Sequence, residues 1–366
     1  MHNDSCFMRK ALALAERGRG RTSPNPMVGA LVVDADGVIV GHGAHEVAGG
    51  PHAEVFALEA AGTRARGATL YCTLEPCCHA GRTGPCAPAV VQAGIRRAVI
   101  AVQDPNPLVQ GGGLAYLRAH GVAVTVGVEQ AAAVRQNAVF LTTMRHDRPH
   151  VILKAAVSID GRLAAAPGAR TALTGAAANR RVQRQRAEVD ALGIGSGTLL
   201  VDDPRLTARG AYRSRPLTRV VFDRRLRTPP SARLLSTLAA GPVIIVSTER
   251  SCAESPDRVH RLQGAGALIL APPAVDLGTA LRALRAAGVT SLLLEGGAAL
   301  HRAALEAGVA DEVHVYITPK PLGGGGVEWM GEGRLAWEAL YDRRAVWLGD
   351  DVLVEGLVQT DVYRNH

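Results

Sequence analysis

The sequence predicts an α/β protein of two domains, and three observations support this prediction. The chain has 366 residues, more than a single domain usually contains. Strand-like and helix-like segments alternate along it, as in sheets covered by helices. The alternation stops at the polar segment MRHDRPH, residues 144–150, and then begins again. We therefore expect a first domain over residues 1–145 and a second over residues 150–366.

The elements of the first domain follow from periodicity and turn residues. Apolar residues from Phe7 to Ala15 recur at helical spacing, and two β-branched runs around Asp36-Gly37 predict a hairpin. Proline and glycine then delimit alternating helices and strands. In order these are a helix at 52–62, a strand at 68–74, a helix at 86–95, a strand at 96–104, a helix at 113–121 and a strand at 122–128. This order predicts a three-layer α/β/α sandwich.

The second domain repeats the alternation. Apolar, β-branched runs predict strands at 151–161, 219–223, 242–248, 267–272, 291–297, 312–319 and 351–358. Amphipathic segments predict helices at 176–187, 276–287 and 298–307. This pattern predicts a second α/β domain.

Composition excludes several classes of protein. The net charge of +8 suits an anionic ligand, but the basic residues form no tract and aromatic residues make up only 4%. We therefore expect no nucleic-acid partner. The N-terminal segment is charged where a signal peptide is apolar, and no apolar run approaches the length of a membrane span. We expect a cytoplasmic protein without a membrane partner.

A cluster of metal-ligand residues lies in the first domain. Four of the six cysteines fall within residues 72–86, which favours a metal site over disulfides. His52, Cys77 and Cys86 supply the three protein ligands typical of a catalytic zinc ion. Glu54 is then available to move a proton from zinc-bound water. His52 and Glu54 lie about 200° apart on a helix, so they converge only near its N-terminus.

The alternative is a closed structural zinc site with Cys78 or Cys72 as fourth ligand. Such a site would leave Glu54 without a function.

The order His-x-Glu followed by two Pro-Cys pairs is the signature of zinc nucleobase deaminases. Longer segments extend the resemblance to both domains, from about residue 5 to residue 358. The segments in the first domain are TSPNPMVGALV, GHGAHEVAGGPHAEVFAL, TLEPCCHAGRTGPC and QDPNP. Those in the second domain are LKAAVSIDGR, GSGTLLVDDPRLTAR, LEGGAAL and DEVHVYITPKPLGG. Through these segments the chain resembles the bifunctional deaminase/reductases of riboflavin biosynthesis.

The resemblance implies a cytidine-deaminase-like first domain and a dihydrofolate-reductase-like second domain. The first would use one zinc ion to deaminate diaminohydroxyphosphoribosylaminopyrimidine through attack of zinc hydroxide. The second would use NADPH to reduce the ribosyl group of the product to ribityl. It also implies a phosphorylated pyrimidine as small-molecule substrate and a homo-oligomer.

The resemblance assigns site residues in both domains. In the first, His52, Cys77 and Cys86 match the zinc ligands, Glu54 the catalytic proton carrier and Asn25 a substrate-binding residue. Asn25 lies between two prolines, so turn formation is an equal explanation; His45 and Arg82 are further candidates for the pocket. In the second, the cofactor-binding candidates are Val157, Ala172, Thr198, Asp202 and Gly297. The substrate-binding candidates are Arg170, Arg186, Leu206, Arg209 and Glu295.

Several reductase residues also have simpler explanations. Arg186 and Arg209 could be surface arginines, and Glu295 a charge at a strand end. The segment 170–174 departs from the family pattern Ser-x-Trp-Ile-Thr, because Arg170 replaces the serine and Ala172 the tryptophan. This departure supports a second hypothesis, a deaminase whose reductase-like domain has reduced or lost activity. A deaminase acting on nucleic acid is a third, which the scarcity of aromatic residues opposes.

Overall fold

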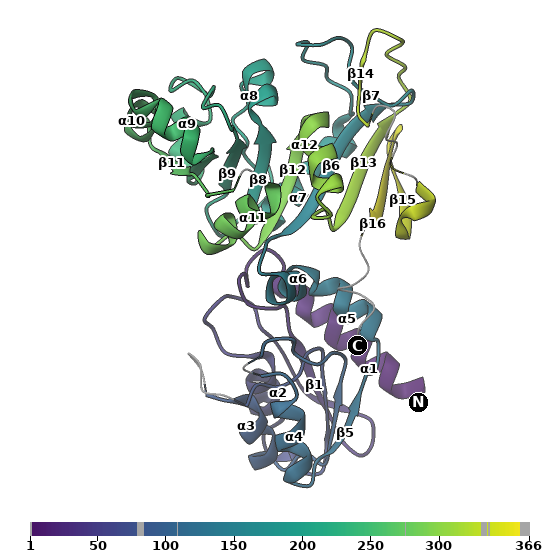
Figure 1. Ribbon diagram of the computed structural model, residues 1–366. Helices are drawn as coiled ribbons and strands as arrows, with labels where there is room; N and C mark the ends of the chain where they lie inside the picture. The colour runs from purple at the N-terminus through teal and green to yellow at the C-terminus, as the bar shows by residue number, and fades with distance from the viewer. Residues whose placement is uncertain are drawn as a thin grey trace. The chain divides into compact units, whose positions relative to one another are not determined.

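A computed structural model describes residues 2–78, 84–107, 109–274, 276–330, 335 and 337–358. Contacts divide the chain into two compact units, the first extending to His146 and the second beginning at Asp147 (Figure 1).

The first unit is built on a five-stranded sheet of order β2-β1-β3-β4-β5. Its strands are β1 (Gly29–Val33), β2 (Ile39–Ala44), β3 (Thr69–Cys72), β4 (Arg97–Ile100) and β5 (Ala123–Val126). β1 runs antiparallel to β2 and β3, whereas β3, β4 and β5 are parallel. The carboxyl ends of the parallel strands therefore lie at one edge of the sheet, where α/β proteins commonly place their ligands.

Helices cover both faces of this sheet, as two glycines show. A Cβ on Gly29 would lie 2.0 Å from the carbonyl oxygen of Ala11, and a Cβ on Gly43 would lie 2.3 Å from that of Ala53. Gly43 is paired with Ala30, so Gly29 faces the opposite side. Helix α1 (His2–Ala15) thus packs on one face and α2 (Ala53–Ala61) on the other, which confirms the predicted three layers.

The remaining helices of the first unit are α3 (Cys86–Gln92), α4 (Gly112–Ala119), α5 (Gln130–Gln136) and α6 (Ala138–His146). The last two were not predicted. Segment 144–150 is also less linker-like than its polarity indicates, because α6 continues to His146 and β6 begins at His150. Phe140 and Leu141 are buried in the core, so packing of their apolar face holds this helix up to its polar end.

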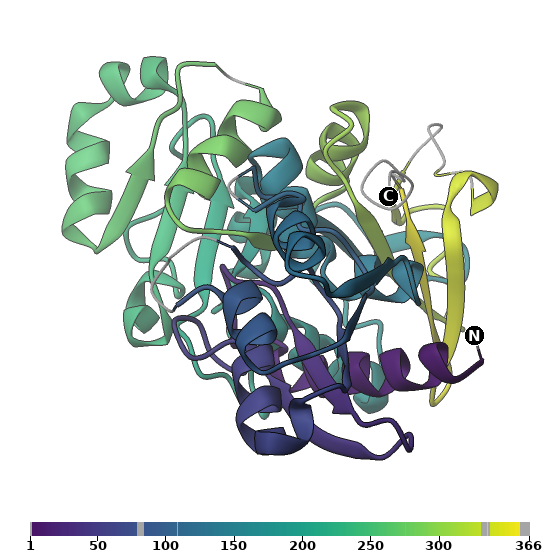
Figure 2. The same ribbon diagram turned by 90° about the horizontal axis from the view of Figure 1, so that it is seen from below.

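The second unit contains a nine-stranded sheet of order β11-β10-β9-β8-β12-β6-β13-β16-β15. The first seven strands in that order are parallel, and β16 and β15 complete the sheet as an antiparallel pair. Figure 2 shows this yellow pair at the opposite side of the unit from the green segments around α9 and α10. The strands are β6 (His150–Ser158), β8 (Ala191–Gly195), β9 (Thr218–Phe222), β10 (Val243–Val246), β11 (Ala267–Leu270), β12 (Ser291–Gly296), β13 (Glu312–Thr318), β15 (Tyr341–Leu348) and β16 (Asp351–Leu357).

Six helices and a small two-stranded sheet complete the described part of this unit. The helices are α7 (Ala176–Glu188), α8 (Ser196–Asp202), α9 (Glu249–Glu254), α10 (Pro256–Gly264), α11 (Leu277–Ala286) and α12 (Ala298–Glu306). Strands β7 (Arg162–Ala164) and β14 (Val327–Glu328) pair with each other. The three predicted helices are found with their ends displaced by no more than one residue.

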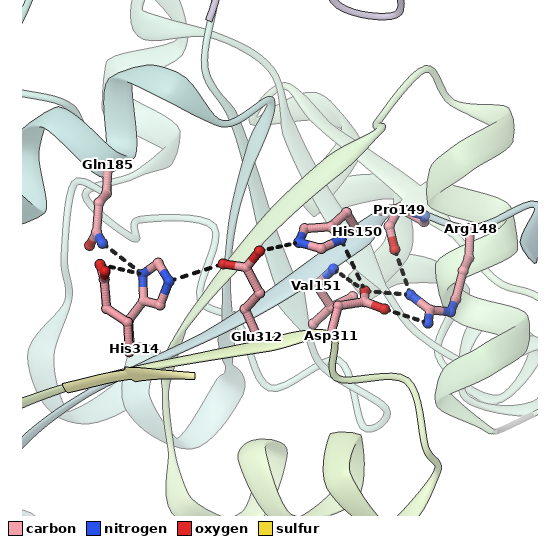
Figure 3. Close-up of polar contacts among 9 residues, drawn as sticks. Arg148, Pro149, His150, Val151, Gln185, Asp311, Glu312 and His314 are labelled. Atoms are coloured by element: carbon pink, nitrogen blue, oxygen red, sulfur yellow. Dashed lines mark hydrogen bonds and ion pairs between the residues drawn. The ribbon is translucent and has the colours of Figure 1, made fainter. Parts of the chain in front are cut away.

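A chain of polar contacts joins β6, β13 and α7 inside the second unit (Figure 3). The buried Asp311 carboxylate accepts two hydrogen bonds from Arg148, of 2.7 and 2.8 Å. The neighbouring Glu312 carboxylate lies between the imidazoles of His150, at 3.3 Å, and His314, at 3.1 Å. Gln185 of α7 donates to His314 over 2.7 Å. These contacts fix α7 against the sheet, and α7 also carries Arg186.

Candidate active sites

The first unit brings the three predicted zinc ligands together. His52 is the residue immediately before α2, Cys77 follows β3, and Cys86 is the first residue of α3. One ligand atom from each lies within 4.8 Å of the others, and His52 Nδ1 is 3.1 Å from Cys86 Sγ. Hydrogen bonds from Cys86 and from His52 lower the pKa of Cys77. A thiolate is therefore favoured here, which is the form of cysteine that binds metal.

This donor set fits zinc and leaves one position open. An imidazole and two sulfur atoms are ligands that zinc prefers, and three protein ligands are typical of catalytic rather than structural sites. Within the described residues the convergent group contains neither Cys72 nor Cys78. A Cβ on Gly112 would lie 2.6 Å from the Cys78 sulfur, so Cys78 packs against the start of α4. The geometry thus favours a catalytic zinc site.

Glu54 lies beside these ligands in the first turn of α2, with only 4% of its surface exposed. Burial raises the pKa of its carboxyl to about 7. A carboxyl with that pKa can both accept and donate a proton near neutral pH. Glu54 therefore has the burial and acidity expected of a proton carrier.

Backbone contacts explain why the two cysteines meet. The Ala87 amide donates to the Cys77 carbonyl over 3.0 Å, which docks the start of α3 on the loop after β3. The buried Glu75 carboxylate accepts three hydrogen bonds of 3.1 Å from the amides of Asp104, Gly111 and Leu114. Glu75 thus ties the segment 104–114 to the loop that carries Cys77. Sequence reasoning did not assign Glu75 a role, because the amide groups that donate to it belong to residues 29 to 39 positions away.

Asn25 and His45 form a second polar group in this unit. His45 Nδ1 lies 2.9 Å from the Pro51 carbonyl oxygen, so it is the protonated nitrogen. His45 Nε2 then accepts from Asn25 Nδ2 over 3.1 Å. This contact orients the Asn25 amide, because its nitrogen faces His45 and its oxygen therefore points away from His45. The imidazole of His45 contacts that of His52 edge to face, with centroids 5.6 Å apart. Asn25 is therefore linked to the ligand group, whereas Arg82 lies outside the described residues.

In the second unit, two predicted substrate residues bind each other. Arg186 Nε and Nη2 donate to the two oxygens of Glu295 over 2.7 and 2.6 Å. Arg186 also donates to the Thr207 carbonyl over 3.0 Å. Burial opposes ionisation of Glu295, but Arg186 and then Lys154 hold the pKa of its carboxyl below the ordinary value. Lys154, from β6, is a charged group of this site that sequence reasoning did not single out.

Glycine and threonine shape the adjacent edge of the sheet. Gly297 follows β12 with a φ of 82°, a conformation that favours glycine. A Cβ on Gly297 would lie 3.2 Å from Thr198 Oγ1. The turns after β8 and β12 therefore touch, and the absence of a Cβ leaves backbone accessible for a dinucleotide phosphate. This observation fits the predicted cofactor site.

The other predicted residues of the second unit differ in exposure. Arg170, Ala172 and Arg209 are exposed, whereas Leu206 and Val157 are buried. Asp202 is partly buried, which raises the pKa of its carboxyl, and the charge of Arg170 opposes that rise. Arg170 therefore lies close enough to Asp202 to interact with it.

Comparison with known proteins finds a family match in each unit. Residues 1–102 match the cytidine and deoxycytidylate deaminase zinc-binding region, and residues 149–354 match the RibD C-terminal domain. The fold and the sites together define an enzyme in which a zinc-dependent deaminase and a reductase share one chain. None of the described helices is long and apolar enough to cross a membrane.

The relatives identify the family. The chain is 40% identical over 322 residues to riboflavin biosynthesis protein RibD of Aquifex aeolicus, covering 88% of each protein. It is 41% identical to that of Escherichia coli K12 over 335 residues, covering 87% of this chain and 89% of the relative. The structure of Acinetobacter baumannii RibD, form 1, superposes with a TM-score of 0.84 at 36% identity, covering 97% of this chain and 99% of that one. The chain belongs to the RibD family of bifunctional riboflavin-biosynthesis enzymes, which use zinc for deamination and NADPH for reduction.

These findings confirm the predicted family, the fold of both domains, the two activities and the two cofactors. A structure from Thermotoga maritima, described as a diaminohydroxyphosphoribosylaminopyrimidine deaminase/5-amino-6-(5-phosphoribosylamino)uracil reductase, has a TM-score of 0.82 at 32% identity. It covers 97% of this chain and 99% of its own.

Proposed function

We propose that the chain acts twice on one phosphorylated pyrimidine. Residues 1–145 deaminate diaminohydroxyphosphoribosylaminopyrimidine, and residues 150–366 reduce the ribosyl group of the product to ribityl. These are the activities for which the T. maritima protein is named. The observation that carries the proposal is the convergence of His52, Cys77 and Cys86 beside the buried Glu54.

In the deaminase, His52, Cys77 and Cys86 would hold the zinc ion. When bound, zinc lowers the pKa of water and so supplies a nucleophile at neutral pH. The Glu54 carboxylate takes a proton from the attacking water and returns it to the amino nitrogen, which leaves as ammonia. The pKa of about 7 allows one carboxyl to perform both transfers. Burial keeps Glu54 away from bulk solvent, which strengthens its interactions with the reacting groups.

Asn25 positions the pyrimidine through its amide oxygen. Its Nδ2 donates to His45, so its Oδ1 is the atom that can accept from an N–H of the ring. Burial lowers the pKa of His45, which keeps the imidazole neutral and Nε2 available as an acceptor. His45 is thereby a positioning residue for Asn25.

In the reductase, Arg186 and Glu295 act as one unit at the substrate. Arg186 fixes the ionised Glu295 carboxylate, which can accept hydrogen bonds from ribosyl hydroxyl groups. Arg209 presents an exposed guanidinium to the substrate phosphate, and Arg170 and Leu206 complete the substrate-binding set. NADPH supplies the hydride when bound. The cofactor-binding set that would hold it consists of Val157, Ala172, Thr198, Asp202 and Gly297.

The deaminase proposal is tested with Glu54→Gln and a matched control, Glu59→Gln, an exposed residue of the same helix. Ammonia release and bound zinc are measured for both. We expect Glu54→Gln to lose roughly 10²-fold or more in rate, as for loss of a general acid–base group, with zinc retained. Normal ammonia release by Glu54→Gln would refute the assignment.

The reductase proposal is tested by following NADPH absorbance after deamination is complete. Glu295→Gln should slow NADPH oxidation, whereas Glu306→Gln, exposed at the end of α12, should not. Complete deamination without any NADPH oxidation would favour the alternative function. In that case the departure at Arg170 and Ala172 has disabled the second domain.

We further propose a cytoplasmic homo-oligomer that binds no nucleic acid. Strand β15 supports the oligomer, because it is an edge strand of the described sheet and nearly all of its residues are exposed. Trp347 within it is 76% exposed, and exposed edge strands with large apolar residues commonly pair with another chain. Light scattering of the wild type and Trp347→Ser tests this, since only an interface at β15 predicts dissociation of the variant. The proposal that the protein binds no nucleic acid is tested by an RNA-binding assay at moderate salt, in which we expect no binding.

A further inference from the structure

Lys154 is a half-buried cation beside the Arg186–Glu295 pair of the second unit. Burial raises the pKa of the Glu295 carboxyl, and the charges of Arg186 and Lys154 outweigh this effect. The Lys154 ammonium therefore lies close enough to Glu295 to interact with it. Within the described part of the chain it forms no hydrogen bond or salt bridge. Its three N–H groups thus remain available to oxygen atoms of a ligand.

The ring of Tyr316 lies beneath this ammonium, with its centroid 5.5 Å from Lys154 Nζ. In the parallel pair of β6 and β13, Lys154 is opposite His314, and Tyr316 is two residues further along β13. Lys154 and Tyr316 are therefore diagonal neighbours on one face of the sheet. An aromatic face attracts a cation at this distance, and the attraction is stronger where water is excluded. The ring thus favours one position of the ammonium.

Tyr316 is itself held in place from two sides. Its side chain is fully buried, and its hydroxyl donates to Gln185 Oε1 over 2.7 Å. Gln185 Nε2 in turn donates to His314 Nδ1 over 2.7 Å (Figure 3). The next residue of α7 is Arg186, which binds the Glu295 carboxylate. The same turn of α7 therefore fixes both the ring and the carboxylate that the ammonium faces.

We propose that Tyr316, held by Gln185, is a positioning residue of the reductase, because its ring keeps the Lys154 ammonium directed at an oxygen atom of the substrate. This inference rests on the proposed reductase function. The four-carbon stem of a lysine is flexible, so without the ring the ammonium could fold onto Glu295. Such an ion pair would withdraw both charged groups from the substrate.

Two substitutions at Tyr316 test the inference in the full-length protein. Tyr316→Leu removes the ring, and it should lower kcat/KM for NADPH oxidation on deaminated substrate by about 10-fold, as for loss of a desolvated cation–π contact. Tyr316→Phe keeps the ring and loses only the hydrogen bond to Gln185, so its value should stay within about threefold of the wild type. Ammonia release should be unchanged in both variants. Equal losses in Tyr316→Leu and Tyr316→Phe would overturn the inference.

Leu353→Ala is the matched control for packing. Leu353 is paired with Tyr316 and belongs to the same core cluster. Its truncation should destabilise the second unit in urea, because it leaves a cavity in that cluster. It should leave kcat/KM for reduction within about twofold, since the ring beneath Lys154 remains. A loss of kcat/KM as large as that of Tyr316→Leu would show that packing alone explains both effects, and would overturn the inference.

Nuclear magnetic resonance tests the contact without any change at Tyr316. The chain has three lysines, Lys10, Lys154 and Lys320, and the first and last are exposed. The double variant Lys10→Arg/Lys320→Arg therefore leaves a single lysine signal after labelling with 13C-lysine. The Cε protons of Lys154 should resonate upfield of an ordinary lysine, because they lie over the face of a ring. A signal at the ordinary position would overturn the inference, even if the Tyr316 variants fail to fold.

The same signal shows whether Tyr316 acts through Lys154. Introducing Tyr316→Leu into the double variant should abolish the upfield shift, whereas Tyr316→Phe should preserve it. Deaminated substrate added without NADPH should move the signal of the double variant, and an unmoved signal would contradict the role given to Lys154.

The inference and the reductase proposal can fail separately. If the wild type oxidises NADPH and Tyr316→Leu does so with the same kcat/KM, the inference is wrong and the reductase proposal stands. If the wild type oxidises no NADPH, the reductase proposal is refuted, while the Lys154 signal still reports whether Tyr316 holds the ammonium.

Discussion

His301 should make the second unit sensitive to acid. It lies in α12, just after the Gly296-Gly297 turn, and is 1% exposed. Its Nδ1 accepts from the Trp329 indole over 2.9 Å, and its Nε2 lies 3.0 Å from the Leu294 carbonyl oxygen. The imidazole is therefore neutral, with the proton on Nε2. A second proton on Nδ1 would face the indole N–H, so protonation breaks this contact.

The magnitude follows from the pKa of His301, which burial lowers to about 4 from the ordinary 6.5. Between these values the unfolded chain binds a proton that the folded chain does not, so stability is lost as the pH falls from 6.5 towards 4. At roughly 1.4 kcal/mol per pKa unit, the loss approaches about 3 kcal/mol at pH 4. Between pH 7 and pH 5 the same linkage gives about 2 kcal/mol.

Urea unfolding followed by tryptophan fluorescence measures this loss, because all three tryptophans, at 329, 337 and 347, lie in the second unit. His301→Gln is the control, since its amide can accept and donate but does not titrate. The stability of the wild type relative to His301→Gln should fall by about 2 kcal/mol from pH 7 to pH 5. If this difference is independent of pH, the imidazole does not resist protonation and the reasoning is wrong.

Three further outcomes are expected. Removing zinc with a chelator should abolish ammonia release but leave NADPH oxidation on deaminated substrate unchanged, which assays before and after zinc is restored would check. Arg148→Met should destabilise the second unit by about 3 to 5 kcal/mol in urea, because Asp311 stays buried without its guanidinium; a loss equal to that of exposed Arg302→Met would contradict this. Glu75→Gln should lower kcat for deamination while zinc is retained, because its amide N–H₂ would face a backbone N–H donor. An unchanged kcat would show that Glu75 does not position the loop that carries Cys77.

The elements that the sequence predicted best are those with strong local signals. The hairpin around Asp36-Gly37 and the helix ending at Gly62 were found as expected, because turn and cap residues act within a few positions. Helix α5 and strand β15 were missed. Helix α5 has only seven residues, too few for a clear helical pattern of apolar residues. Strand β15 is exposed on both faces, so β15 lacks the alternation of apolar and polar residues by which a half-buried strand is recognised.

The residues of the two sites also differ in how well the sequence alone could identify them. His52, Glu54, Cys77 and Cys86 could be selected from sequence because zinc ligands and a proton carrier must be particular residue types in a particular order. Arg186 and Glu295 could be selected only through a family resemblance. Their direct pairing was not foreseen, because nothing local indicates that residues 109 positions apart will meet.

The sequence by itself determined the class of enzyme, its family and the identity of the zinc-site candidates, since these depend on residue chemistry and spacing. The tertiary structure decided which charged groups form ion pairs with one another and which remain available to bind a ligand. It pairs Arg186 with Glu295, places Arg227 on Ser196 and buries His301 between Leu294 and Trp329. Such properties depend on distance and burial, which arise only when distant segments pack together.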